Sequence, residues 1–275
     1  MKILFISLGC DKNLADSEEM LGLLTGNGHE IVDSEEEADA IVINTCCFIH
    51  DAKEESVNTI LEMAEYKKTG TCKILIVTGC MAQRYKEEIT EEIPEVDAVL
   101  GTTSYGDIVK ALNEAEAGHV FREFKDINAL PEDSGRRVIT TGGHFGYLKI
   151  AEGCDKHCTY CIIPSLRGKF RSVPEERLLK QAEYMASQGV RELILVAQET
   201  TVYGTDLYGK KTLHILLKKL CQIKGIRWIR VLYCYPEEIY DELIQVMKEE
   251  KKICHYLDLP IQHASDRILK NRATR

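Results

Sequence analysis

Three cysteines in one short run carry the clearest chemical meaning in this chain. Cys154, Cys158 and Cys161 are separated by three and by two residues. Thiolates at such spacings can bind three irons of a cubane iron–sulfur cluster, which leaves the fourth iron without a protein ligand. A metal with an open position can bind a substrate or cofactor, as catalytic zinc sites illustrate. The spacing therefore predicts a cluster with one iron available to a further ligand.

Two simpler interpretations of this run are a structural zinc site and a ferredoxin-type electron carrier. A structural zinc ion normally takes four ligands in paired two-residue spacings, and His157 lies inside the loop, poorly placed to be the fourth. A bacterial-type ferredoxin places a cysteine directly before a proline, whereas Pro164 has no cysteine before it. The spacing favours the open cubane, with both interpretations as alternatives.

A second set of three cysteines follows apolar runs in the first half of the chain. Cys10, Cys46 and Cys80 each stand just after a run typical of a buried parallel strand. Because parallel strands place their C-terminal ends on one edge of a sheet, we expect these thiols to converge there. Gly9 and Gly79 allow the tight turns that close approach to a bulky cluster requires. A second three-thiolate cluster site follows, with three buried core cysteines as the alternative.

The remaining cysteines lack such spacing. Cys47 competes with Cys46, but Cys46 matches its counterparts by its distance from the strand. We interpret four others as structural: Cys72, Cys221, Cys234 and Cys254.

Alternating strand and helix patterns organise the chain around these cysteines. The apolar runs are short and largely β-branched, and the stretches between them carry apolar residues at spacings of three and four. This alternation predicts a doubly wound parallel sheet in residues 1–116, a polar connector in 117–143 and further β/α units in 144–275. Expected strands and helices of the first domain are Ile3–Ile6, Ser17–Leu24, Ala40–Ile43, Lys53–Tyr66, Ile74–Val77 and Val96–Leu100. Those of the second are Tyr147–Ala151, Pro174–Gln188, Glu192–Val196, Leu213–Lys224, Trp228–Tyr233, Pro236–Lys248 and Tyr256–Leu259, with a helix after Ala264.

Composition limits the classes of protein and partner. The 275 residues are 44% hydrophobic and 29% charged, which is normal for a globular protein of two domains. The formal charge of −9 does not favour nucleic acid as a partner. Eleven cysteines clustered beside loops predict metal ligation in a reducing cytoplasm. No run approaches the ~20 apolar residues that span a bilayer, so we expect no membrane association.

The cysteine loop resembles that of the radical S-adenosylmethionine (SAM) enzymes, including the aromatic Tyr160 before its third cysteine. In that superfamily the open iron chelates the amino and carboxylate groups of SAM. Several longer motifs resemble the methylthiotransferases of this superfamily, and specifically their ribosomal-protein branch. These motifs are Ser7–Glu18, Asn44–Ile49, Asp51–Ser56, Gly79–Tyr85, Cys161–Gly168 and Gln198–Gly204. The sister branch, which modifies adenosine in tRNA, differs at Lys12-Asn13-Leu14 and at Pro164-Ser165.

The resemblance implies an enzyme with two [4Fe-4S] clusters and SAM. Its expected reaction inserts sulfur and a methyl group at the β-carbon of an aspartate of small-subunit ribosomal protein S-twelve. The family implies a 5′-deoxyadenosyl radical that removes hydrogen, sulfur from the second cluster, a methyl group from a second SAM, and a flavodoxin- or ferredoxin-type reductant. A tRNA methylthiotransferase and a non-enzymatic electron carrier are the alternatives. Family members carry a further C-terminal β-barrel and a longer partial β/α barrel, so we expect this chain to be a truncated fragment.

Several residues receive roles by position. Tyr160 is expected near the adenine of SAM, and Gln198 and Glu199 are expected to accept its methionine ammonium group. His263 is read either as facing the pocket or as structural. No residue is assigned as catalytic. A short basic run is read either as contacting carboxylates of SAM or substrate or as a solvated loop: Arg167, Lys169 and Arg171.

Overall fold

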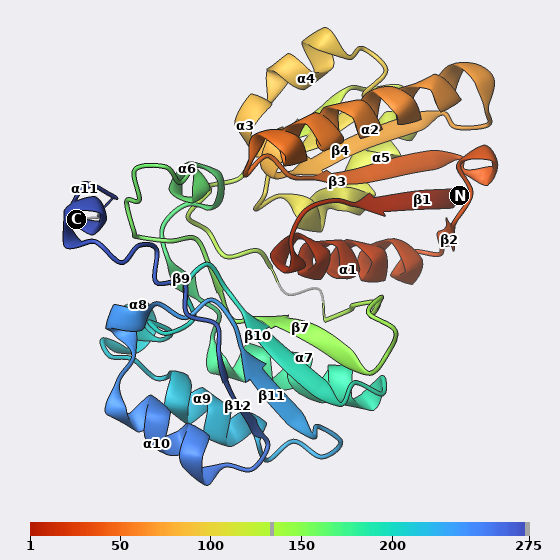
Figure 1. Ribbon diagram of the computed structural model, residues 1–275. Coiled ribbons are helices and arrows are strands. Elements are labelled where there is room, and N and C mark those ends of the chain that lie inside the picture. The colour runs from red at the N-terminus through yellow and green to blue at the C-terminus, as the bar shows by residue number, and fades with distance from the viewer. Residues whose placement is uncertain (133–134, 273–275) are drawn as a thin grey trace. The chain divides into compact units, whose positions relative to one another are not determined.

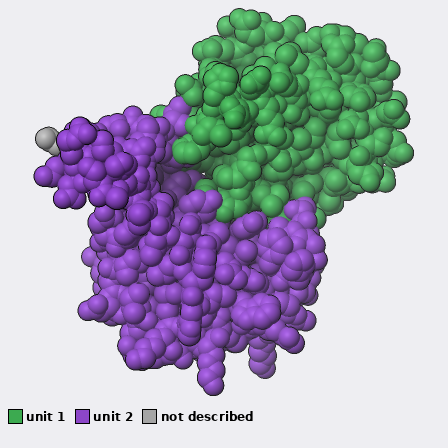
Figure 2. Space-filling view, viewed as in Figure 1, with its two compact units in different colours: residues 1–138, 165–167 green, residues 139–164, 168–275 purple. Residues whose placement is uncertain are grey.

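The computed structural model describes residues 1–132 and 135–272 (Figure 1). The chain divides into two compact units, coloured separately in Figure 2. Unit 1 comprises residues 1–138 together with 165–167, and unit 2 comprises residues 139–164 and 168–275. Unit 1 is therefore discontinuous in sequence, because three residues from the second half of the chain belong to it.

Unit 1 contains a six-stranded sheet in which every neighbouring pair is parallel, in the order β2-β1-β3-β4-β5-β6 (Figure 1). The expected doubly wound α/β fold is thus confirmed. The predicted connector contains one of these strands, β6. The strands are β1 (Lys2–Ser7), β2 (Glu30–Val32), β3 (Ala40–Thr45), β4 (Ile74–Gly79), β5 (Ala98–Leu100) and β6 (Phe121–Glu123).

Helices pack on both faces of this sheet. Helices α1 (Asp11–Gly26) and α5 (Ile108–Glu116) contact each other and share one hydrophobic core with alternate residues of the strands. The intervening strand residues point to the opposite face, where α2 (His50–Thr69) and α3 (Cys80–Tyr85) contact β3 and β4. The helix α4 (Glu87–Glu92) and the 3-10 turns η1 (Glu35–Glu37) and η2 (Tyr105–Asp107) complete the unit. Burial on both faces explains why the central strands are continuous apolar runs.

Unit 2 contains a four-stranded parallel sheet in the order β12-β11-β10-β7 (Figure 1). Its strands are β7 (Phe145–Lys149), β10 (Glu192–Val196), β11 (Trp228–Val231) and β12 (Ile253–Leu257). A short antiparallel pair, β8 (Ala151–Glu152) and β9 (Arg171–Ser172), brackets the cysteine loop. The bracketed segment therefore leaves the sheet at the C-terminal end of its first strand, where parallel sheets carry their sites.

The helices of unit 2 connect its strands in sequence. They are α7 (Glu175–Ser187), α8 (Thr205–Tyr208), α9 (Leu213–Leu220), α10 (Asp241–Glu249) and α11 (Asp266–Arg272). The short helix α6 (Ile163–Arg167) ends in the three residues that belong to unit 1. The single helix expected over Pro236–Lys248 is wrong, because a 3-10 turn, η3 (Pro236–Glu238), precedes α10 and extended residues separate the two. Within the described ranges, no helix combines the length and the apolar character needed to cross a membrane.

Candidate functional site

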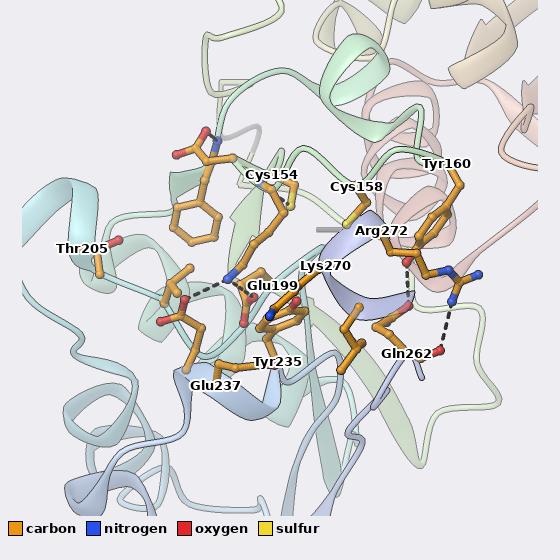
Figure 3. A pocket seen from close by; sticks show the side chains of 16 residues that line it. Cys154, Cys158, Tyr160, Glu199, Thr205, Tyr235, Glu237, Gln262, Lys270 and Arg272 are labelled. Atoms are coloured by element: carbon orange, nitrogen blue, oxygen red, sulfur yellow. Dashed lines mark hydrogen bonds and ion pairs between the residues drawn. The ribbon is translucent and has the colours of Figure 1, made fainter. Parts of the chain in front are cut away.

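A cavity of about 620 Å³ lies in unit 2 at the C-terminal ends of its strands. Its walls come from the loops after successive strands: Cys154 follows β7 and β8, Glu199 follows β10, Tyr235 follows β11 and Gln262 follows β12. Figure 3 shows these side chains around the hollow. We name it the strand-end cavity. Its position agrees with the place expected for the active site of a parallel sheet.

Hydrogen bonds within unit 2 join the start of the cysteine loop to the residues that follow it. The Cys154 amide donates to the Gly168 carbonyl at 3.1 Å, and the Phe170 amide donates to the Asp155 carboxylate at 2.9 Å. Gly153 has φ +71°, and a Cβ there would lie 2.1 Å from the carbonyl oxygen of Lys169. Only glycine fits this turn, so the backbone before the first cysteine is fixed by close packing.

The three thiols of this loop, which we call the loop triplet, remain partly accessible. Cys154 and Cys158 line the strand-end cavity, and Cys161 is half-buried beside them in sequence. Burial raises the pKa of Cys154 to about 11 and also raises that of Cys161. Since metals bind thiolates, cluster assembly here would release protons. Their free, partly exposed state fits a set of cluster ligands.

A site for a single metal ion differs in geometry from a site for a cubane cluster. In residues 1–132 and 135–272, no three His, Cys, Asp or Glu side chains are arranged to hold one metal ion. A structural zinc ion needs four ligands around a single centre, whereas a cubane spreads its thiolates over different irons. The loop triplet supplies three thiolates, one fewer than the four ligands of a structural zinc site.

An acidic wall faces the loop triplet across the cavity. Glu199 is only 4% exposed and accepts a hydrogen bond from the Thr201 hydroxyl. Burial raises the pKa of Glu199 above its ordinary value. The Lys156 ammonium lies 4.0 Å from Glu199, 2.8 Å from Glu238 and 4.0 Å from the centre of the Tyr235 ring. Two carboxylates and an aromatic face thus form a place that suits a cation.

Of the other residues that were given roles from the sequence, one lines the strand-end cavity and two do not. Tyr160 lines the cavity, is 52% exposed, and donates to the Gln262 side chain at 2.6 Å. Gln198 does not line the cavity, although its side-chain oxygen is buried and has no hydrogen-bond partner in the described residues. His263 is exposed, lies outside the cavity lining, and accepts a hydrogen bond from the Ser265 amide at 2.8 Å. Of these three, only Tyr160 lies where a cofactor in the cavity could touch it.

In unit 1, the sheet brings the other three cysteines to one edge. Strands β1, β3 and β4 are adjacent, and Ser7 pairs with Asn44 while Thr45 pairs with Gly79. Because these strand ends are in register, the residues that follow them emerge side by side. The cysteines that follow are Cys10, Cys46 and Cys80, which we call the sheet triplet.

Two glycines before these cysteines are required by the packing. Gly9 has φ +88°, and a Cβ there would lie 2.6 Å from the Cβ and 2.9 Å from the Sγ of Cys46. Gly79 has φ +93°, and a Cβ there would lie 2.3 Å from the Asn44 side-chain oxygen. The absent Cβ at Gly9 lets the backbone lie close to the Cys46 side chain, and the absent Cβ at Gly79 lets it lie close to Asn44 and Thr45.

The sheet triplet combines one exposed thiol with two buried ones. Cys10 is exposed, and Cys46 and Cys80 are buried. Burial raises the pKa of Cys46 and of Cys80, and in Cys80 the Arg167 guanidinium opposes this rise. Ser56 fixes the Cys46 backbone, since its hydroxyl accepts from the Cys46 amide at 3.0 Å and donates to the carbonyl at 2.8 Å. Three thiols that follow adjacent strand ends on one edge suit, by number and type, the ligand set of a cluster with an open iron.

The remaining cysteines are distributed through the two units. Cys47 is buried next to the sheet triplet, and burial raises its pKa to about 12. Cys72, Cys221 and Cys234 are buried, and Cys254 is partly buried. Burial also raises the pKa of each of these four thiols, as expected for packed, protonated side chains.

The basic run after the cysteine loop is not a uniform solvated surface. Lys169 is exposed and Arg171 is intermediate, but Arg167 is buried within unit 1, where it bonds to Asp16 and Asn13. The alternative of a solvated loop is therefore wrong for Arg167, whose carboxylate partner in the structure is Asp16. Its partners precede it by 151 and 154 residues. Two features of the sequence bear on this contact: the polar residues at the start of α1 and the glycine that follows Arg167. Neither identifies Asp16 or Asn13 as a partner of Arg167.

Comparison with known proteins gives two family matches, one in each half of the chain. Residues 2–101 match the family described as uncharacterized protein family UPF0004, and residues 148–275 match the radical SAM superfamily. The radical SAM match implies SAM and one [4Fe-4S] cluster as cofactors.

Solved structures with the same fold include two radical SAM enzymes described with bound cobalamin. TsrM from Kitasatospora setae superposes with a TM-score of 0.65 at 11% identity over 100% of this chain and 62% of its own. OxsB superposes with a TM-score of 0.62 at 15% identity over 98% of this chain and 45% of its own. At such low identity these structures establish the fold alone.

Curated relatives are much closer in sequence. The ribosomal protein uS12 methylthiotransferase RimO of Lachnoclostridium phytofermentans is 67% identical over 275 residues, and that of Clostridioides difficile is 53% identical over 276. Both alignments include 100% of this chain and 62% of the relative, so the chain spans about three fifths of their length. With both family matches in place and alignments to these relatives that extend over the whole chain, the chain belongs to the radical SAM methylthiotransferase family.

Proposed function

We propose that this chain carries out the methylthiolation of an aspartate β-carbon in ribosomal protein uS12. One observation carries the proposal: each unit presents three free thiols at the C-terminal edge of its own parallel sheet. A radical enzyme that only cleaves SAM needs a single such set, whereas insertion of sulfur gives the second set a purpose. The relatives at 67% and 53% identity, which are named for uS12, support the choice of substrate.

The loop triplet is the proposed site of the first cluster. Cys154, Cys158 and Cys161 would hold it, and SAM would occupy the strand-end cavity. When bound, this cluster and SAM supply the radical chemistry that an unactivated C–H bond requires and that side chains cannot provide. The cavity walls then bind and orient the cofactor, because a radical must be formed close to the atom it attacks.

Contacts to SAM are proposed for three residues. Glu199 is buried on the cavity wall and accepts the methionine ammonium group, exchanging its weak 4.0 Å contact with Lys156 for a direct one. Tyr160 stacks near the adenine from the exposed rim. Gln198, the neighbour of Glu199 in sequence, supplies a buried oxygen that lacks a partner among the described residues, although it lies outside the cavity lining, and its contact to the ammonium group is proposed from the sequence position.

The sheet triplet is the proposed site of a second [4Fe-4S] cluster. Cys10, Cys46 and Cys80 would bind three of its irons, and the fourth iron would hold the sulfur to be transferred. The exposure of Cys10 leaves one side of the set open to sulfur donors and substrate, while Cys46 and Cys80 anchor it to the sheet. The protein's part is to fix the open position on a rigid edge.

The proposed setting is a reducing cytoplasm with a flavodoxin- or ferredoxin-type reductant. The eleven cysteines are free in the structure, and low-potential clusters need an electron source. A second SAM is proposed to supply the methyl group.

The test is anaerobic reconstitution followed by incubation with separate substrates. We expect about eight irons per chain, the content of two cubes. With reductant, sulfide and SAM, uS12 should gain one methylthio group by mass spectrometry, while tRNA should remain unmodified. Modification of tRNA instead would assign the sister activity, and loss of SAM cleavage altogether would indicate an electron carrier.

A further inference from the structure

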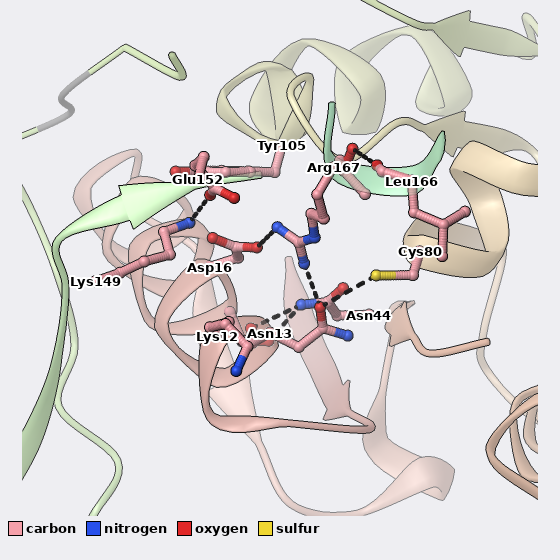
Figure 4. A network of polar contacts seen from close by, with 12 residues as sticks. Lys12, Asn13, Asp16, Asn44, Cys80, Tyr105, Lys149, Glu152, Leu166 and Arg167 are labelled. Atoms are coloured by element: carbon pink, nitrogen blue, oxygen red, sulfur yellow. Dashed lines mark hydrogen bonds and ion pairs between the residues drawn. The ribbon is translucent and has the colours of Figure 1, made fainter. Parts of the chain in front are cut away.

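A buried polar network lies directly beneath the sheet triplet, at the start of α1 (Figure 4). The Arg167 guanidinium donates to the Asp16 carboxylate at 2.7 Å and to the Asn13 side-chain oxygen at 2.5 Å. Arg167 is 3% exposed and Asn13 is fully buried. All three residues belong to unit 1, so this arrangement is internal to one compact body.

Asn13 connects this network to the backbone beside the thiols. Its side-chain nitrogen donates to the carbonyl of Thr45 at 2.9 Å and to that of Leu8 at 3.1 Å. Thr45 directly precedes Cys46, and Leu8 stands two residues before Cys10. The Cys80 thiol lies 3.8 Å from the Asn13 side-chain oxygen. One amide therefore touches the surroundings of all three cysteines.

The orientation of this amide depends on Arg167. An amide has one accepting and one donating end, and the two carbonyls require the donating end to face them. The accepting end then needs a donor, and the forked guanidinium supplies one while its other arm is held by Asp16. Among the described residues, the buried oxygen of Asn13 would then keep only the long contact to Cys80 if Arg167 were removed.

We propose that Arg167 is a positioning residue of the sheet triplet, which fixes the Asn13 amide and holds a positive charge beside a cluster bound there. The inference rests on the proposed function, because it assumes that the sheet triplet binds a cluster. A positive charge next to a cluster stabilises its reduced, more negative state and so raises its midpoint potential. Asp16 orients that charge and partly offsets it.

The experiment isolates the second cluster in the full 275-residue chain. A parent protein with Cys154→Ala, Cys158→Ala and Cys161→Ala is reconstituted anaerobically, and its iron content and electron paramagnetic resonance spectrum are followed during a redox titration. About four irons are expected in this parent, the content of one cube. The variants Arg167→Met, Arg167→Lys and Asp16→Asn are then compared with it.

A matched control is a second buried ion pair that involves the same helix, α1. Arg137 and Glu18 form another buried ion pair in unit 1, at 2.6 Å. Glu18 stands five residues beyond Asn13, about 7.5 Å further along the helix axis. Arg137→Met therefore removes a buried charge of the same kind from a position that does not hold the Asn13 amide.

The signs of the shifts decide the inference. Arg167→Met should raise the ratio of oxidised to reduced cluster at the parent midpoint at least tenfold, which is 59 mV for one electron. Asp16→Asn should shift the potential the other way, and Arg167→Lys should shift it less than Arg167→Met. If Arg167 has a merely structural role, Arg167→Met and Asp16→Asn should shift the midpoint potential in the same direction. Shifts in the same direction therefore overturn the inference. A shift in Arg137→Met as large as that in Arg167→Met also overturns it.

Two further outcomes are distinguishable. If Arg167→Met does not fold, the other two variants decide. The inference then requires a higher midpoint potential in Asp16→Asn and a midpoint potential close to that of the parent in Arg167→Lys. A parent that binds no iron contradicts the second cluster of the proposed function, and the role of Arg167 falls with it. A loaded parent whose potential is indifferent to Arg167 overturns this inference alone.

Discussion

Replacement of Gly9 by alanine should destabilise the backbone around the sheet triplet for two reasons, the backbone conformation of Gly9 and the contact of a new Cβ with Cys46. The left-handed backbone at Gly9 costs an L-residue about 1–2 kcal/mol. The new Cβ would also stand 2.6 Å from the Cβ of Cys46, and such overpacking costs about 1–3 kcal/mol more. We therefore expect Gly9→Ala to lower the free energy of unfolding of unit 1 by about 2–5 kcal/mol.

Gly28→Ala is the matched control for this prediction. Gly28 has φ +84°, close to the +88° of Gly9, but a Cβ there would have nothing within 4 Å. Gly28→Ala should therefore lower the free energy of unfolding only by the conformational cost, about 1–2 kcal/mol. The difference between the two variants measures the close approach of the Gly9 backbone to Cys46.

Hydrogen exchange followed by mass spectrometry reports on the strands concerned. Amides of β1 and β3 should exchange faster in Gly9→Ala than in Gly28→Ala, by about tenfold for each 1.4 kcal/mol of difference. After reconstitution, iron should fall toward about four per chain in Gly9→Ala and stay near about eight in Gly28→Ala. If the two variants exchange alike and bind iron alike, the reasoning from the Cys46 contact is refuted.

Three further predictions concern the two triplets, the cavity and the core. Cys154→Ala should abolish SAM cleavage, whereas Cys80→Ala should keep cleavage and lose sulfur insertion; equal loss in both, measured as 5′-deoxyadenosine and methylthiolated product, would contradict separate roles. Burial raises the pKa of Glu199, and its carboxylate form binds a cation, so SAM affinity should rise with pH through that pKa and then level off. Glu199→Gln should weaken binding by about 1.5–3 kcal/mol and remove this pH dependence, as titration calorimetry can check; an unchanged pH profile would exclude the contact. Leu217→Ala, at a fully buried position of α9, should destabilise unit 2 by about 2–5 kcal/mol in urea unfolding followed through the single tryptophan, Trp228, and a cost below 1 kcal/mol would contradict its place in the core.

The central strands could be predicted from sequence because burial on both faces leaves a continuous apolar signal. Ala40–Thr45 and Ile74–Gly79 are buried throughout, and the expected runs fall inside them. The strands β2 and β6 gave no such signal. Each has three residues, includes charged side chains and lies at an edge of the sheet, where one flank remains open to solvent.

The positions of both triplets at the C-terminal ends of strands could be predicted from spacing and from the apolar runs before them, and their role as cluster ligands stays a prediction. The partners of Arg167 could not be assigned, because a buried ion pair between residues 151 apart leaves no mark in a local pattern. Helix α1 shows the same difficulty. Its first turns bury polar residues such as Asn13 and Asp16, so the apolar period begins only later and the expected helix started at Ser17 instead of Asp11.

The discontinuity of unit 1 has a consequence for synthesis of the protein. Residues 165–167 complete a body whose other residues end at 138, and Arg167 neutralises the buried Asp16. On a ribosome, the contact between Arg167 and Asp16 can form only after about thirty residues beyond position 138 have been translated, so completion of unit 1 is delayed. A polypeptide that ends at residue 138 should, for the same reason, lack residues 165–167 and with them the ion pair between Arg167 and Asp16.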